Sequence, residues 1–423
     1  MRFLSALVAA AAVSLAAVPL AAQVASVTVL GSPCGASLAA TLPVLGTTMA
    51  FTIDGAAPPL LGALLQSPGP GVPVPLAGCD IFLSSLDVTA AFVTDASGDA
   101  SVAATLANIP AFLGSLVVVQ GVLFRDTGPV LGLDVTNAVE LRLGVAPPTG
   151  GTFPPSWIHG ASNCSTSSDP PIQVHPYAAR TWILRQSKCV NFEGPFLYLL
   201  AGTQKALLID SGATASATAF PVRATVQALL DAYELANGLP NLQIVVAHTH
   251  SHGDHTQGDS QFVGQPNTTV VGTGLAAVQS FFGITTWPTQ IVALDLGGRS
   301  VDVIPTPGHH ATHISFHDAE TGALFTGDTL YPGHLFVSSL AAYKPSIARL
   351  VVFAQSRTIV DFLGAHVEMT STPGVAYPYG TTWQPNEHAL RLDLAQLLEL
   401  DTALQSVTGP ITQVHAEFVI EVF

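Results

Sequence analysis

The chain has 423 residues, of which 48% are hydrophobic and only 10% are charged, and its formal net charge is −15. This length predicts two domains, and the apolar fraction is ample for buried cores. An acidic chain repels phosphate backbones, so the charge balance argues against nucleic acid as a partner.

Residues 1–22 have the pattern of a secretory signal peptide. Met1-Arg2 gives a short positive start, residues 3–20 are almost wholly apolar, and small residues near Ala22 offer a cleavage site. A retained membrane anchor is the alternative, because the apolar run could just span a bilayer. We favour cleavage. No later apolar run is long enough to span a bilayer, so we expect a secreted or periplasmic protein without stable membrane insertion.

Residues 23–144 consist of short apolar runs separated by glycine, proline, serine and aspartate, which predicts an all-β accessory domain resembling a sandwich. Strands are expected at Thr48–Thr52, Ile81–Leu83, Val88–Val93, Ser101–Leu106, Leu116–Val122 and Val139–Leu143. This part contains no histidine and few charges, so it has little from which to build a catalytic site. It loosely resembles small β domains of other exported bacterial proteins, and both a binding role and a spacer role stay open.

The four cysteines fit an oxidising, exported setting. The simplest pairing is local, Cys34 with Cys79 and Cys164 with Cys189, although four cysteines allow three connectivities. Because none lies in a CxxC motif or beside a histidine cluster, we expect disulfides rather than metal or redox roles.

Residues 145–170 are predicted to be a linker, because Val145–Gly151 is rich in proline and glycine. Residues 171–423 alternate strand and helix signals, which predicts a mixed α/β domain. Helices are expected at Pro221–Asn237, Ser346–Phe353 and Glu387–Leu404, and strands at Leu242–Ala247, Ser300–Pro305, Thr312–His317, Ala323–Thr326 and Thr358–Leu363.

The stretch from His248 to His255, HTHSHGDH, holds four imidazoles and one carboxylate directly after an expected strand. Imidazole and carboxylate suit zinc and neighbouring first-row metals. A solvated histidine-rich loop is the alternative. However, His309, Asp328 and His366 each follow another apolar strand in the same way. Four such sets are hard to obtain by accident, so the sequence predicts a metal site.

These motifs resemble the metallo-β-lactamase-fold hydrolase superfamily, over a segment from about Pro171 to the C-terminus. The HxHxDH signature lies at residues 250–255, and TPGH ends at His309. Asp210 lies in an early DSG turn that matches the family's Asp-x-Gly. The resemblance implies an αββα sandwich, in which two mixed sheets pack face to face with helices outside and the site lies at one edge.

The same resemblance implies two divalent metal ions, expected to be zinc, with manganese or iron chemically allowed. The first ion would be bound by His250, His252 and His309, the second by Asp254, His255 and His366, and Asp328 would bridge them. A metal-bound hydroxide would attack the substrate, with Asp254 as the catalytic residue that orients it. Asp210 is expected to orient the histidine loop rather than bind metal.

Other residues near these motifs have open roles. In the lactonase-like branch a tyrosine near the offset of Tyr331 assists the carbonyl oxygen, so Tyr331 is a catalytic candidate, and a core aromatic is the alternative. His310 and His313 could touch substrate or cap their loop. His334 is a candidate for the pocket rim. The aromatic segment 377–383 could line the pocket or cover the helix that follows.

The carboxylate of Asp328 argues against a β-lactamase, because those enzymes usually carry cysteine or another non-bridging residue there. It resembles the glyoxalase II, lactonase and phosphodiesterase-like branches. Glyoxalase II itself fits poorly, since its substrate is cytosolic and no basic glutathione-binding tract is evident. We therefore expect hydrolysis of a small-molecule ester, lactone or thioester. The alternatives are a β-lactamase or phosphodiesterase-type hydrolase, an iron-dependent oxidoreductase on the same fold, or a non-catalytic binding protein. The oligomeric state is not indicated.

Overall fold

The computed structural model describes residues 24–423 apart from 57–58, 70, 86, 126–129 and 131. The chain divides into two compact units, residues 1–147 and 148–423. The predicted signal peptide, residues 1–22, lies outside the described residues.

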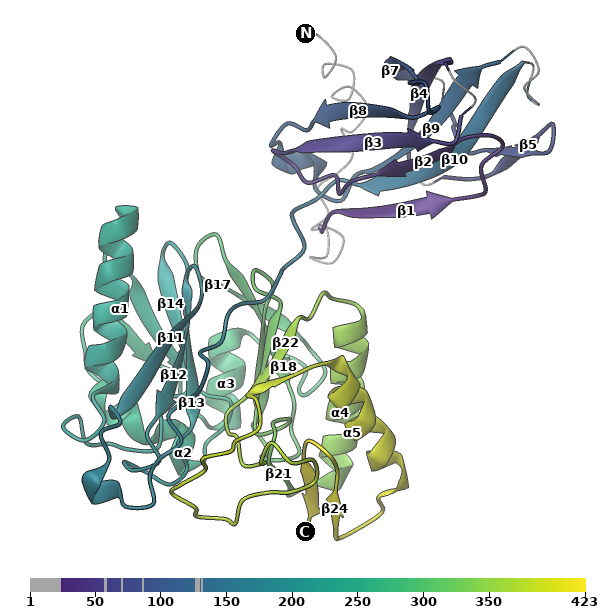
Figure 1. The fold of residues 1–423 in the computed structure, drawn as a ribbon. Helices are drawn as coiled ribbons and strands as arrows, with labels where there is room; N and C mark the ends of the chain where they lie inside the picture. The colour runs from purple at the N-terminus through teal and green to yellow at the C-terminus, as the bar shows by residue number, and fades with distance from the viewer. Residues whose placement is uncertain (1–23, 57–58, 70, 86, 126–129, 131) are drawn as a thin grey trace. The chain divides into compact units, whose positions relative to one another are not determined.

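The first unit is built from antiparallel strands, as its alternating sequence pattern predicts. One sheet has the order β1-β10-β9-β4-β7 and a second has the order β2-β3-β8 (Figure 1). The strands of the first sheet are β1 (Ser26–Leu30), β10 (Leu133–Arg142), β9 (Leu116–Phe124), β4 (Leu61–Pro68) and β7 (Asp87–Val93). Those of the second are β2 (Ser37–Ala40), β3 (Thr48–Asp54) and β8 (Ala100–Thr105). Phe51 and Ile53 of β3 share one buried cluster with Leu64, Leu123 and Val139 of the larger sheet. The predicted all-β unit is confirmed.

Two disulfides join residues that are near one another in the chain, Cys34 to Cys79 and Cys164 to Cys189. The predicted local pairing is therefore confirmed. Cys79 begins the short strand β6 (Cys79–Ile81), which pairs with β5 (Val74–Leu76). None of the helices in the described part of the chain combines the length and apolar character needed to cross a membrane.

The second unit contains two six-stranded mixed sheets. The first has the order β11-β12-β13-β14-β15-β16, and the second has the order β17-β18-β19-β20-β22-β23. The first comprises β11 (Ile172–Ala178), β12 (Thr181–Gln186), β13 (Phe196–Ala201), β14 (Lys205–Ile209), β15 (Gln243–Ala247) and β16 (Thr268–Val270). The second comprises β17 (Val292–Asp295), β18 (Ser300–Pro305), β19 (Ile314–Asp318), β20 (Ala323–Gly327), β22 (Asp361–Gly364) and β23 (Arg391–Leu392). A small third sheet joins β21 (His334–Val337), β25 (Val419–Val422) and β24 (Ile411–Val414).

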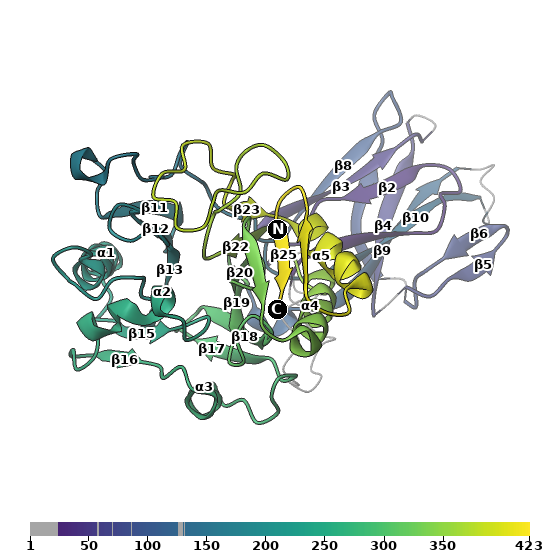
Figure 2. The same ribbon diagram turned by 90° about the horizontal axis from the view of Figure 1, so that it is seen from below.

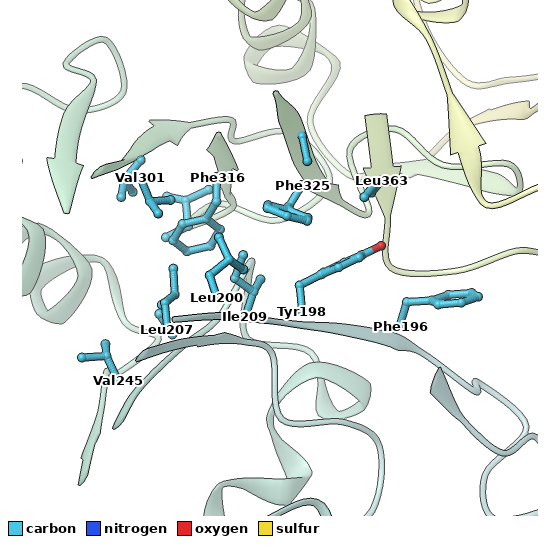
Figure 3. Close-up of a cluster of buried hydrophobic side chains, with 14 of the residues drawn as sticks. Phe196, Tyr198, Leu200, Leu207, Ile209, Val245, Val301, Phe316, Phe325 and Leu363 are labelled. Carbon is cyan, nitrogen blue, oxygen red and sulfur yellow. The ribbon is translucent and has the colours of Figure 1, made fainter. Parts of the chain in front are cut away.

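The two six-stranded sheets pack face to face through apolar side chains. Leu207 and Ile209 of β14 point toward Phe316 of β19 and Phe325 of β20 (Figure 3). Their chain neighbours point the other way, because side chains alternate along a strand. Leu208 therefore joins a second cluster with the helix on the outside of the first sheet.

Helices cover the outer faces of both sheets. They are α1 (Val222–Asn237) on the first sheet, and α4 (Leu340–Gln355) and α5 (Leu394–Ser406) on the second (Figure 2). A short helix, α3 (Leu275–Phe282), contributes Val278 to the core between the sheets. The layers are thus helix, sheet, sheet, helix, and the predicted αββα fold is confirmed.

Some element boundaries differ from the sequence prediction. α1 lies where predicted and ends at Gly238, which has the left-handed φ of 63° that favours glycine. The helix predicted at Glu387–Leu404 is wrong in its first turns, because Arg391–Leu392 pairs with β22 as a strand. α5 begins only after Asp393, whose carboxylate accepts the backbone N–H of Ala395 in a capping box.

Residues predicted as the linker 145–170 make backbone contacts with the second unit from Pro148 onward. The Gly150 N–H donates to the carbonyl of Thr321 at 3.1 Å, and the Thr152 N–H donates to that of Tyr177 at 2.8 Å. The boundary between the compact units falls between Pro147 and Pro148.

Candidate metal centre

The predicted ligands follow the ends of four strands. β15 delivers the loop 248–252 and the single-turn helix α2 (Gly253–Thr256), while His309 follows β18, Asp328 follows β20 and His366 follows β22. β14 and β15 are parallel neighbours in one sheet, and β20 and β22 are parallel neighbours in the other. Within each sheet, the C-terminal ends of the two strands therefore lie at the same edge.

The imidazoles of His250, His252 and His309 converge on one point. Nε2 of His250 lies 2.9 Å from Nδ1 of His252, and Nε2 of His309 lies 3.2 and 3.1 Å from these two atoms. Nδ1 of His309 donates to the Phe336 carbonyl at 2.8 Å, which leaves a lone pair on its Nε2. Three nitrogen lone pairs this close repel one another. A metal ion bound between them would remove this repulsion by accepting all three lone pairs.

A second group contains Asp254, His255, Asp328 and His366, whose ligand atoms all lie within 4.8 Å of one another. Oδ2 of Asp254 lies 3.0 Å from Nε2 of His255 and 3.1 Å from Nε2 of His366. Nε2 of His255 and Oδ1 of Asp328 are buried without a hydrogen-bond partner. Buried polar atoms are normally satisfied, so these two atoms fit a metal ion as the missing partner.

The carboxylate of Asp328 lies between the two groups. Its Oδ1 is 3.4 Å from Nε2 of His255 and 3.5 Å from Nε2 of His366. Its Oδ2 is 3.5 Å from Nε2 of His309 and 3.8 Å from Nε2 of His250. The structure thus brings together all seven side chains that the sequence singled out as ligands, with one carboxylate facing both sets.

Asp210 holds the loop that begins at His248 through contacts with two of its residues. Its carboxylate accepts the Thr249 N–H at 2.8 Å and faces Nδ1 of His255 at 2.8 Å. The residue has a φ of 64°, a conformation that aspartate tolerates better than most residues. The expected orienting role of Asp210 agrees with these contacts. His366 is oriented similarly, since its Nδ1 lies 3.3 Å from the carbonyl oxygen of Glu193.

The two groups differ in their electrostatics. Burial, together with the neighbouring imidazoles, holds the pKa of His250 well below its usual value. Burial also opposes the charging of His366, but the carboxylates of Asp328 and Asp254 outweigh it and raise the pKa of His366 to about 9. For Asp254 and Asp328 the opposite holds, because the adjacent His255 and His366 keep the pKa of both carboxyls below its usual range despite burial. Without metal, His250, whose pKa is lowered, is therefore neutral at pH 7, whereas the second group is ionic.

His313 is a supporting residue that the sequence analysis did not place. It is fully buried, and its Nε2 accepts the backbone N–H of Asp328 at 3.2 Å. Its ring stacks on that of His250 with centroids 5.1 Å apart. His313 therefore supports Asp328 and His250 from within the core. The only sequence feature that could have indicated this role is that His313 is the fourth residue after His309.

Tyr331 presents its ring rather than its hydroxyl to the site. The ring centroid lies 5.6 Å from that of His366, whereas the buried hydroxyl donates to the His334 carbonyl. His334 itself faces Glu421, with Nδ1 2.6 Å from the carboxylate. In the aromatic segment 377–383, Tyr377 and Tyr379 line a small pocket beside Glu193.

Comparison with known families agrees with this geometry. The family model of the Metallo-beta-lactamase superfamily matches residues 191–400, a range that includes all seven side chains. The chain belongs to this superfamily.

Several curated relatives carry the name hydroxyacylglutathione hydrolase. The protein of Rhizobium meliloti is 32% identical over 38% of this chain and 64% of its own length. The protein of Dechloromonas aromatica is 26% identical over 54% of this chain and 82% of its own length. That of Chelativorans is 31% identical over 30% of this chain and 49% of its own length, so this chain spans about half to two thirds of several such relatives.

Among solved structures, the metallo-beta-lactamase from Pontibacter korlensis is 18% identical with a TM-score of 0.37, covering 56% of this chain and 100% of that protein. The metallo-beta-lactamase from Hirschia baltica is 16% identical with a TM-score of 0.35, covering 47% of this chain and 91% of that protein.

Proposed function

We propose that the chain is a metal-dependent hydrolase of a small ester, lactone or thioester. The observation that carries this proposal is the convergence of two ligand groups around one carboxylate, that of Asp328. Imidazole and carboxylate are ligands for zinc, which we expect here, while manganese and iron also accept them. His250, His252 and His309 would hold one ion, and Asp254, His255 and His366 the other, with Asp328 between them.

Bound metal ions supply a hydroxide at neutral pH and polarise a carbonyl oxygen. The chain itself supplies the orientation. His250, His255 and Asp328 are buried, whereas His252 is exposed and Asp254 is half-buried. Substrate would therefore approach from the side of His252 and Asp254. The Asp254 carboxylate, which lies between the imidazoles of His255 and His366, would orient the attacking hydroxide by accepting a hydrogen bond from it.

Two features favour an acyl substrate. The curated relatives are named for a hydroxyacylglutathione, which is a thioester. Asp328 provides a carboxylate where the β-lactamase branch usually has none. A β-lactamase, a phosphodiesterase-type hydrolase and an iron-dependent oxidoreductase remain the alternatives that the same ligand set allows.

We also propose that the protein is exported. Two disulfides per chain are typical of an oxidising compartment and rare in the cytosol. With the predicted signal peptide, they favour a secreted or periplasmic location.

Metal analysis of the purified protein, combined with a panel of esters, lactones, thioesters, a phosphodiester and a β-lactam, tests the function. We expect about two metal ions per chain and metal-dependent turnover of an acyl substrate. His250→Ala should lose metal and turnover, whereas His415→Ala, which alters a histidine that faces Glu399, should retain both. Turnover of only the phosphodiester or the β-lactam would overturn the acyl assignment. Bound iron with oxygen consumption would favour the oxidoreductase.

A further inference from the structure

A small pocket beside the second ligand group has aromatic and acidic walls. Its lining includes Phe192, Glu193, Glu368, Tyr377 and Tyr379. Two backbone connections place it next to the candidate centre. The carbonyl oxygen of Glu193 faces His366, and Glu368 lies two residues after His366 in the same segment. A substrate held at the centre would therefore have one end within reach of this pocket.

The walls favour a cation. The rings of Phe192 and Tyr379 lie 5.6 Å apart at an interplanar angle of 73°. Aromatic faces attract ammonium groups through the ring quadrupole. The Tyr379 hydroxyl donates to Oε1 of Glu193 at 3.4 Å, and Glu368 accepts the backbone N–H of His334 at 2.9 Å. Each carboxylate therefore keeps acceptor capacity, because a carboxylate has several lone pairs.

One lysine also lines the pocket, and its ammonium already donates to two backbone carbonyls. Lys188 is only 4% exposed, and its ammonium donates to the carbonyl oxygens of Phe192 and Glu193 at 2.9 and 3.3 Å. Two of its three N–H donors are thereby used, and its charge also interacts with Glu387, Glu368 and Glu193, which oppose the lowering of its pKa to about 8 by burial. The carboxylates of Glu193 and Glu368 are each partly exposed, so the acidic groups rather than the lysine are available to a ligand.

The pocket is narrow, with room for about one water-sized group. A primary ammonium has this size and donates three hydrogen bonds, whereas a trimethylated ammonium is larger and donates none. A carboxylate of the substrate would meet Glu193 and Glu368 and be repelled.

We propose that this pocket binds a primary ammonium group of the substrate, so that the enzyme prefers amino-substituted esters, lactones or thioesters over neutral and anionic ones. This inference rests on the proposed hydrolytic function for its location relative to the reacting bond.

A charge series of acyl substrates tests the proposal with the metal-loaded protein. The series is β-alanine methyl ester, methyl butanoate, monomethyl succinate and the N-trimethylated β-alanine ester, with the same series made as thioesters. We expect kcat/KM for the primary ammonium substrate to exceed that for the neutral one by about tenfold, as one charge-assisted hydrogen bond allows. The anionic and trimethylated substrates should fall at or below the neutral one.

Glu193→Gln and Glu368→Gln should each reduce the ratio of ammonium to neutral substrate toward one, and Tyr379→Leu should reduce it partly. Glu399→Gln is the matched control, because this carboxylate faces His415 outside the pocket. A ratio near one in the unmodified protein, or a ratio unchanged in both glutamine variants, would overturn the proposal.

Binding of n-butylammonium, with n-butanol and butanoate as neutral and anionic comparisons, provides a readout that needs no turnover. We expect the cation to bind about tenfold more tightly than the alcohol, and this preference to disappear in the glutamine variants. Preferential cation binding without hydrolysis of any acyl substrate would leave the pocket in place and refute the proposed function. Hydrolysis of acyl substrates without any preference for the ammonium group would support the proposed function and refute the ammonium pocket.

Discussion

Nδ1 of His255 lies 2.8 Å from Oδ2 of Asp210, and both side chains are buried. Because a carboxylate only accepts, Nδ1 carries a proton, so Nε2 of His255 is the ring nitrogen that can bind a metal ion beside Asp254 and Asp328. Asp210 also accepts from Thr249 in the same loop. One carboxylate thus fixes both the tautomer of a ligand and the start of the loop that carries it.

Asp210→Asn should weaken metal binding at the second group by about 10- to 100-fold, the usual cost of removing a carboxylate that orients a ligating histidine. Asparagine tolerates the left-handed φ at this position, so the variant should fold. Competition with a chelator measures the affinity. Asp259→Asn is the control, since Asp259 faces His248, which is not in either ligand group. Unchanged affinity in folded Asp210→Asn would contradict this role.

Metal binding at the second group should depend on pH and release protons. The pKa of His366 is raised to about 9 and that of His255 is also raised, so both imidazoles are protonated at pH 7 without metal. A bound ion needs their lone pairs, so the affinity should increase at least about tenfold per pH unit between pH 7 and 9. The stability of the metal-free protein should change with pH in the opposite direction. The free energy of unfolding that protonated His366 contributes is fully present below pH 6.5 and is lost as pH rises through about 9.

Calorimetry in buffers of different ionisation enthalpy counts these protons. His250→Ala leaves the second group intact and should show the pH dependence. His366→Ala leaves the first group intact, and its metal affinity should depend little on pH. The pKa values of His250 and His252 are lowered, so both imidazoles are already neutral at pH 7. A pH-independent affinity in His250→Ala would refute this electrostatic difference.

The metal ligands could be predicted from the sequence because each one is marked by the residues next to it in the chain. Each of the four segments places its side chain directly after an apolar strand, and strand ends at one sheet edge are where sites form. The assignment of His366 to the same ion as Asp254, 112 residues away in the chain, came from the family resemblance rather than from any local pattern.

The errors involve contacts between distant residues. The spacing of Leu390, Leu394 and Leu397 fits a helix, yet Leu392 pairs with Phe362 in a strand, a contact that periodicity cannot reveal. The position of Tyr331 shortly after Asp328 correctly indicated that this residue lies near the candidate metal centre. The direction of its hydroxyl depends on the His334 carbonyl in the turn that follows, so the sequence pattern did not determine it.

Gly308→Ala should disrupt the first ligand group. A Cβ at this position would lie 2.4 Å from Cα of Tyr343 in α4, and the φ of 150° is one that side chains rarely adopt. Since the backbone of α4 cannot yield cheaply, the loop should shift and displace His309. We expect a loss of about 1–3 kcal/mol in the free energy of unfolding and the loss of one metal ion per chain. Gly409→Ala, where a Cβ meets nothing within 4 Å, is the matched control.

Urea unfolding and metal analysis of the two glycine variants give the comparison. A Gly308→Ala protein that keeps two ions per chain would show that the loop accommodates the methyl group without moving His309.

The disulfide between Cys164 and Cys189 should stabilise the loop that contains Glu193. This loop connects β12 to β13, and its Glu193 carbonyl accepts from His366. Cross-linking residues 25 apart contributes about 3 kcal/mol in the chain-entropy view, so Cys164→Ser with Cys189→Ser should lower the free energy of unfolding of the second unit by about that amount. The affinity for the second metal ion should fall as well, because His366 loses a fixed acceptor.

Cys34→Ser with Cys79→Ser is the matched pair of substitutions in the first unit, which contains none of the seven ligands. It should destabilise that unit while metal affinity and turnover stay unchanged. If both double variants weakened metal binding equally, the effect could not come from the Glu193 loop. If neither did, the contact between Glu193 and His366 would be maintained by the sheet alone, since Phe196 at the start of β13 is fully buried and its N–H donates to the Ala365 carbonyl beside His366.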